Sequence, residues 1–103
     1  MLHGRLTLPR FVDVVSTSPA RLMGLASKGR LEPGADADIV VIDPTDERLI
    51  KTRNLHQKAD CTPYEGMVVR GWPRHVWLRG EPIIFGRQLS GYAGQGRFVP
   101  RTL

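Results

Sequence analysis

The spacing of apolar residues changes near residue 27, from a helical period to the short runs that are typical of strands. In the first part, apolar side chains recur at intervals of three and four residues, at Leu8, Phe11, Val12 and Val15. Thr7 is a suitable N-cap for this segment, and Pro9 lies in its first turn. Ser18 and Pro19 repeat the start signal, and Gly24 marks the end of a second short helix. We expect two short helices whose apolar sides pack on something else.

A run of four β-branched apolar residues at positions 39–42 is the most informative strand signal. It follows a turn that contains Gly34, and Pro44 stops it. Because the run is too short for a core helix and is flanked by Gly and Pro, it predicts a strand that is buried on both faces. Such a strand needs neighbours, so the chain must supply a sheet around it or belong to something larger.

The chain up to residue 85 predicts further strands separated by turns. Residues 43–46 predict a turn and residues 48–52 a short strand, whereas residues 54–64 are polar and irregular. Three more strands are expected at residues 67–70, 74–79 and 82–85, the last two joined as a hairpin at residues 79–81. Beyond Gly86 the many glycines and few apolar residues predict an extended arm outside the core. The expected fold class is mainly β, with two short helices in front.

Length and composition limit the class of protein. The chain has 103 residues, enough for one domain with a modest core, and its 11 glycines and 8 prolines indicate many turns. No apolar stretch approaches the roughly 20 residues that span a bilayer, and the first residues lack the apolar centre of a signal peptide. A single cysteine, Cys61, agrees with a reducing compartment. We therefore expect a cytoplasmic protein without a membrane partner.

The net charge of +5 brings nucleic acid into consideration as a partner. The basic residues are spread along the chain, however, and form no dense cluster. Arginines do alternate with aromatic residues between positions 70 and 87, as they do on surfaces that stack single strands. Arginines on the wet side of strands and aromatic residues on the dry side produce the same pattern, and we adopt that interpretation. We expect no nucleic-acid partner.

The residue types that carry catalysis form no recognisable motif. The three histidines, His3, His56 and His75, lie far apart and contain no H-x-H or H-E-x-x-H pair that would place two imidazoles on one metal ion. No serine lies in a G-x-S-x-G elbow. The glycines around Gln95 resemble a phosphate loop only superficially, because no strand precedes them and no helix follows. We assign no catalytic, cofactor-binding or metal-binding residue to this chain.

Three carboxylates surround the expected strand at residues 39–42. Asp36, Asp38 and Asp43 could form a paired carboxylate site. A structural interpretation fits better, in which Asp36 and Asp38 accept hydrogen bonds from turn amides and Asp43 stabilises the turn with Pro44.

Five segments occur in an order that is similar to a known family. They read STSPARLMGL, KGRLEPGADADIVVIDP, PYEGM, WLRG and GRFVPR, at residues 16–25, 28–44, 63–67, 77–80 and 96–101. Together they resemble the C-terminal portion of the cyclic amidohydrolases, in the dihydropyrimidinase and hydantoinase group, of which allantoinases and dihydroorotases are close relatives. The resemblance extends from about residue 5 to residue 101. The GADADIVVIDP element is shared by much of the superfamily, whereas the irregular segment, the EGM turn and the GRFVPR end favour the hydantoinase branch.

The resemblance implies an architecture and an activity for the complete protein. Members of this group are several times longer and carry a (β/α)8 barrel with two divalent metal ions, commonly zinc, whose ligands all lie upstream of the matched segment. Residues 1–26 would then be the last helices of the barrel, residues 27–86 the C-terminal strands of the adjoining β-sandwich, and residues 87–103 an arm that reaches across an oligomer interface. The full-length relatives hydrolyse cyclic amides, and we expect this chain alone to be inactive, with no cofactor of its own.

Two interpretations of the chain from different functional classes remain open. As the C-terminal part of such a hydrolase it would pack against an upstream catalytic barrel or against further copies of itself, and it could be a truncated product, an excised domain or one piece of a split protein. The alternative is a small free-standing β module that binds a protein partner through an open sheet edge, or, less favoured, single-stranded nucleic acid. An upstream reading frame that encodes H-x-H would distinguish the two.

Overall fold

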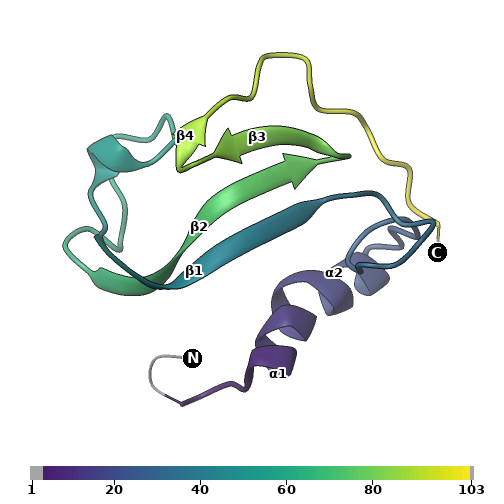
Figure 1. Ribbon diagram of the computed structural model, residues 1–103, viewed down its shortest axis with the longest axis horizontal. Coiled ribbons are helices and arrows are strands. Elements are labelled where there is room, and N and C mark those ends of the chain that lie inside the picture. The colour runs from purple at the N-terminus through teal and green to yellow at the C-terminus, as the bar shows by residue number, and fades with distance from the viewer. Residues whose placement is uncertain (1–3, 103) are drawn as a thin grey trace.

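The computed structural model describes residues 4–102 as a helical rod followed by a four-stranded antiparallel sheet (Figure 1). His3, which the sequence analysis singled out, lies outside the described residues. The expected fold class, mainly β with short helices in front, is confirmed.

The rod consists of two short helices joined by one wider turn. Helix α1 spans Leu8–Val12, a π-helical turn spans Asp13–Thr17, and helix α2 spans Ser18–Leu22. Thr7 caps α1 as expected, because its side-chain oxygen accepts a hydrogen bond from the Arg10 N–H at 3.4 Å. The π turn ends two residues before Pro19, which has no N–H and whose ring would clash with the carbonyl group four residues earlier in a regular helix. The two expected helices therefore form one continuous rod.

Gly24 ends the rod in a Schellman motif. The Leu25 N–H donates to the Ala20 carbonyl at 2.9 Å, and the Gly24 N–H donates to the Arg21 carbonyl at 3.1 Å. Gly24 has a φ of +68°, which lies in the left-handed region that this motif requires. The predicted role of this glycine as a helix terminator is confirmed.

The sheet has the strand order β1-β2-β3-β4, with every neighbour antiparallel. Its strands are β1, β2, β3 and β4, at Ile39–Leu49, Val68–Leu78, Glu81–Phe85 and Gln88–Leu89. A 3₁₀ turn at Thr52–Asn54 lies in the long connection between β1 and β2. Two-residue turns join β2 to β3 and β3 to β4, and both residues of each turn have positive φ, as in type I′ turns. The predicted hairpin at residues 79–81 is confirmed.

One predicted turn and one predicted break between strands are wrong, because the strands continue through both. Residues 43–46 lie inside β1, at a register shift between Asp43 and Glu47. Pro44 has no N–H for the ladder, and Asp43 Oδ1 accepts hydrogen bonds from the Thr45 N–H at 3.0 Å and the Thr45 hydroxyl at 2.7 Å, so the proline falls in a bulge. Gly71, whose φ is +91°, similarly leaves β2 unbroken where two strands were expected.

The expectation that residues 39–42 are buried on both faces is wrong for this chain. Strand β1 is the edge of the sheet and pairs only with β2, and the side chains of Val40 and Val41 are 54% and 42% exposed. A hydrophobic run shows that a strand is suited to being covered, and does not specify which element covers it.

The arm after Gly86 is also more ordered than expected. Gln88–Leu89 forms the fourth strand, and the side chain of Gln95 is one of the two buried residues in the described range. The arm then runs along the β3 side of the sheet and ends beside α2 (Figure 1). Its glycines permit turns that return the chain to the sheet, so low hydrophobicity alone was a poor guide.

The described residues enclose almost no core. Ala20 is the one buried hydrophobic residue in the range 4–102, and within that range no helix contacts a strand. The accessible surface is 8206 Å², whereas a folded monomer of this size exposes about 5,800 Å². The radius of gyration is 15.2 Å, compared with about 13 Å for a compact domain. In the described residues no helix is long and apolar enough to cross a membrane.

Candidate functional site

The histidines do not come together. His75 lies on β2, where its Nδ1 accepts a hydrogen bond from the Gly86 N–H at 3.0 Å and its ring packs on Phe85 with centroids 4.6 Å apart. His56 lies in the irregular connection after the 3₁₀ turn. Across residues 4–102, no three His, Cys, Asp or Glu side chains gather as a metal site. The described residues therefore do not fit the metal pair that the resemblance implies, and no catalytic step can be built on them.

Two of the three carboxylates considered from the sequence meet on a lysine. Lys28 Nζ lies 2.8 Å from Asp36 Oδ2 and 2.5 Å from Asp38 Oδ2. Burial acts to lower the pKa of Lys28, but the hydrogen bonds and charges of the two carboxylates outweigh it and raise this pKa. Hydrogen bonds from Lys28 and then Ser27 lower the pKa of Asp36. The raised pKa of Lys28 and the lowered pKa of Asp36 both favour the charged forms, which suits an ion pair and not proton transfer.

Asp43 lies apart from that pair and belongs to a second network. Hydrogen bonds from the Thr45 side chain and backbone lower its pKa, and the charge of Arg87 contributes. Arg87 Nη2 lies 3.3 Å from Asp43 Oδ2, and Arg87 Nε lies 2.9 Å from Asp46 Oδ2. Arg48 completes the network, with its Nε 3.1 Å from Asp46 Oδ1. The network joins the turn between β3 and β4 to β1, across the width of the sheet.

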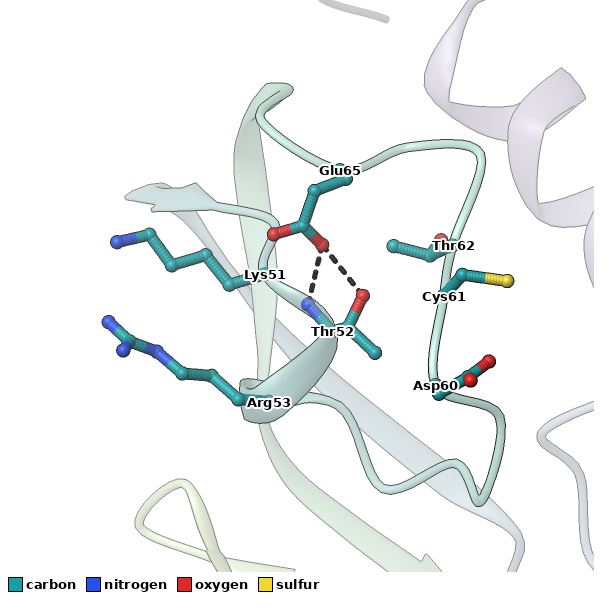
Figure 2. Close-up of a pocket in the computed structure, with 7 residues that line it drawn as sticks. All are labelled: Lys51, Thr52, Arg53, Asp60, Cys61, Thr62 and Glu65. Carbon is teal, nitrogen blue, oxygen red and sulfur yellow. Dashed lines mark hydrogen bonds between the residues drawn. The ribbon is translucent and has the colours of Figure 1, made fainter.

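A hollow lies in the connection between β1 and β2 (Figure 2). It has a volume of about 550 Å³ and is lined by Lys51, Thr52, Arg53, Asp60, Cys61, Thr62 and Glu65. Glu65 Oε2 accepts hydrogen bonds from the Thr52 N–H and hydroxyl, both at 2.7 Å, and these lower the Glu65 pKa. Figure 2 shows the Lys51 and Arg53 side chains extending away from Asp60 and Cys61. The charged groups do not converge on one point, so the hollow has no arrangement for catalysis.

The segment around Gln95 is a structural anchor and not a phosphate loop. Gln95 Nε2 donates to Glu81 Oε2 at 3.2 Å, and Gln95 Oε1 accepts from the Tyr92 N–H at 3.3 Å. The Arg79 guanidinium donates to the Gln95 carbonyl oxygen. Sequence reasoning missed this role, because the partners lie 14 and 16 residues away and leave no local signal.

The sheet carries apolar side chains on both faces. Direct pairing aligns one row across all four strands, which we call the cross-sheet row: Val40, Val76, Ile84 and Leu89. Each neighbouring residue points to the opposite face, where Val41 pairs with His75 and His75 packs on Phe85. A sheet that is apolar on both faces is typical of a layer with cover on both sides. These surfaces are the main functional feature of the described chain.

Comparison with known proteins places the chain in a family of longer proteins. A model of the amidohydrolase family matches residues 1–84. The chain belongs to the amidohydrolase family. This family member is 48% identical over 100 residues to a D-hydantoinase of Geobacillus stearothermophilus, an alignment that covers 96% of the chain and 21% of the relative. It is 44% identical over 102 residues to a D-phenylhydantoinase of Escherichia coli (strain K12 / DH10B), which covers 98% of the chain and 22% of the relative.

Solved structures give the same assignment to the amidohydrolase fold. A crystal structure of D-hydantoinase superposes with a TM-score of 0.95 at 42% identity, over 99% of the chain and 22% of that protein. A dihydropyrimidinase from Brevibacillus agri has a TM-score of 0.93 at 42% identity, over 97% of the chain and 22% of that protein. An L-hydantoinase from Arthrobacter aurescens has a TM-score of 0.89 at 32% identity, over 96% of the chain and 22% of that protein. The amidohydrolase chain thus spans about a fifth of the length of the relatives that it matches.

Proposed function

We propose that this chain is the C-terminal, non-catalytic part of a metal-dependent hydrolase that opens cyclic amides of the hydantoin and dihydropyrimidine type. The observation that carries the proposal is a mismatch between sequence and burial. The chain is 44 to 48% identical to hydantoinases over nearly its whole length, yet Ala20 is its one buried hydrophobic residue within the described range.

The amount of uncovered surface supports a structural role within something larger. The excess over a folded monomer is about 2,400 Å² on this chain alone. Together with the matching surface of a partner, this corresponds to the upper end of obligate interfaces, which bury about 2,000 to 5,000 Å² in total. We propose that the catalytic part of the same enzyme, together with further copies of it, covers this surface.

The structural neighbours support a role for this chain that does not determine which enantiomer of a substrate is bound. Proteins named as D-hydantoinase, L-hydantoinase and dihydropyrimidinase share the fold of this chain, with TM-scores from 0.89 to 0.95. A segment with the same shape in enzymes named for opposite enantiomers suits a scaffold better than a specificity pocket. On this proposal, substrate contacts and metal ligands belong to the remaining four-fifths of the enzyme.

One observation favours a second candidate, a free-standing interaction module. Strand β1 is an open sheet edge of 11 residues with exposed valines, which could pair with an extended segment of a protein partner. This candidate needs no catalytic polypeptide upstream.

The test is hydrolysis of hydantoin and dihydrouracil by the purified chain, with metal content measured by elemental analysis of the same sample. We expect no turnover and no stoichiometric metal, together with an upstream reading frame that encodes an H-x-H pair. Turnover with bound metal would refute the non-catalytic assignment. No turnover and no such upstream frame would instead favour the interaction module.

A further inference from the structure

The helical rod and the sheet do not touch, and the C-terminal arm bridges them. The arm leaves β4, runs along the β3 side of the sheet and ends beside α2 (Figure 1). It is held at two points. Gln95 is buried against Glu81 and Arg79 near the β2–β3 turn, and the Thr102 N–H donates to the Gly24 carbonyl oxygen at 2.8 Å at the end of the rod.

The contact at Gly24 depends on the absence of a side chain. A Cβ placed on Gly24 would lie 2.2 Å from the Thr102 carbonyl oxygen and 2.8 Å from the Thr102 carbonyl carbon. These are backbone atoms, which cannot swing aside as the end of a flexible side chain can. Gly24 thus serves two purposes, because it takes the left-handed φ that ends the helix and it leaves room for the arm.

The surroundings of this contact form a groove. A hollow of about 300 Å³ lies at the end of α2, and Ala20, Leu25, Gly29 and Thr102 are among the residues that line it. The middle of the arm is not held by side-chain burial, because Phe98 is 90% exposed. The docking therefore rests on the two ends of the arm and on backbone contact in the groove.

We propose that residues 96–102 of this chain form an intrachain strap, whose last residue docks by backbone contact on Gly24, beside the hollow at the end of α2. The strap fixes the angle between rod and sheet, which no helix–strand packing sets within the described range. The loop before β1 also joins the two, because the Thr17 hydroxyl donates to the Gly29 carbonyl oxygen and Asp38 accepts from the Arg79 N–H, so loss of the strap loosens the rod without releasing it.

Hydrogen exchange of backbone amides in the 103-residue chain tests this strap. The Thr102 amide should exchange at least about tenfold more slowly than in an unstructured peptide, because its hydrogen bond must open first. Gly24→Ala should return the Thr102 amide to the unstructured rate, while the amides of β2 stay protected and show that the variant is folded.

Two matched variants separate the clash from other effects. Gly34 also has a positive φ, +91°, but nothing lies within 4 Å of the Cβ position, so Gly34→Ala should leave Thr102 protected. Phe98→Ala should also leave it protected. Equal loss of protection in Gly24→Ala and Gly34→Ala, or an unprotected Thr102 in the unchanged chain, would overturn the proposal.

A measurement of mass and a double-mutant cycle complete the test. Protection of Thr102 that disappears on dilution, with a doubled mass in sedimentation, would mean that the strap of a second copy docks on Gly24, and the intrachain assignment would fail. When residues 96–103 are deleted, Gly24→Ala should destabilise the chain no more than Gly34→Ala does, because the clashing atoms are gone. If Gly24→Ala lowers the free energy of unfolding by the same amount with and without residues 96–103, the proposed strap would be contradicted.

Discussion

Asp38 holds the backbone of Arg79, a residue 41 positions farther along the chain: Asp38 Oδ1 accepts a hydrogen bond from the Arg79 N–H at 2.9 Å. Arg79 has a φ of +48°, unusual for a residue with a side chain, and begins the turn between β2 and β3. The other carboxylate oxygen of Asp38 lies 2.5 Å from Lys28 Nζ. One side chain thus connects the loop before β1 to the turn after β2.

Replacing Asp38 tests this connection. Asp38→Ala should lower the free energy of unfolding by about 1–3 kcal/mol, since it removes a charged acceptor from a partly buried N–H. Asp38→Asn is the matched control, because its amide oxygen can still accept from Arg79 while the ion pair with Lys28 is lost, so its loss should be smaller. Urea unfolding followed by circular dichroism measures both variants. An Asp38→Ala variant as stable as the unchanged chain would contradict this role.

The turn between β3 and β4 allows a test of backbone strain. Arg87 has a φ of +68°, a conformation that glycine adopts without steric cost. Arg87→Gly and Arg87→Ala both remove the ion pairs with Asp43 and Asp46, but only glycine relieves the backbone. We expect Arg87→Gly to be more stable than Arg87→Ala by about 1 kcal/mol, as measured by thermal unfolding. Equal stability of the two variants would show that the positive φ carries no cost.

Glu65 makes the connection between β1 and β2 sensitive to acid. Hydrogen bonds from Thr52 lower its pKa below the ordinary value of 4.5. A depressed folded pKa contributes stability that is present above 4.5 and is lost as the pH falls through the lower folded value. We expect a carbon-detected NMR titration to give a Glu65 midpoint below 4.5.

The control for this pH dependence is Glu65→Gln, which cannot titrate. The unchanged chain should lose more stability than the variant between about pH 5 and pH 3. Parallel stability curves for the two proteins over this interval would argue against the role of Glu65.

The exposed edge of the sheet predicts an unusual result for a charge in an apolar run. Val41 is 42% exposed on β1, so Val41→Asp should leave the far-ultraviolet circular dichroism spectrum of the isolated chain unchanged. Val76 is half-buried on β2 and has a paired strand on each side, so Val76→Asp should lower the free energy of unfolding more than Val41→Asp does, because it interrupts the cross-sheet row.

The Val41→Asp variant also reports on assembly. If the open edge of the sheet drives contact with other chains, Val41→Asp should also reduce concentration-dependent association in analytical ultracentrifugation. Association that is unaffected by this charge would place the contact elsewhere on the surface.

Local signals in the sequence predicted the parts of the fold that depend on local physics. Thr7 as an N-cap, Gly24 as the end of the rod and the turn at Gly80 each follow from the conformational preference of one residue and its near neighbours. The resemblance of the five segments to cyclic amidohydrolases is likewise confirmed by the family match. The division at residues 26 and 86 stays a prediction.

The features that the sequence did not predict depend on contacts between residues that are far apart in the chain. Pro44 looked like the end of a strand, and only pairing of the flanking residues with β2 shows that the strand continues past it. Gln95 looked like part of a solvated arm, and its burial comes from Glu81 and Arg79. Apolar residues at 39–42 indicated cover on both faces, but a single sequence does not specify whether that cover lies in the same chain or outside it.

The meeting of Thr102 with Gly24 means that the stretch between them leaves and returns at one point in space. A segment of this kind can be cut out and grafted as a cassette, because the distance that its host must bridge is short whatever the length of the loop between. Exchange of residues 25–101 between members of this family would then require two neighbouring junctions only. The sheet could in this way be transplanted while the rod stays in place.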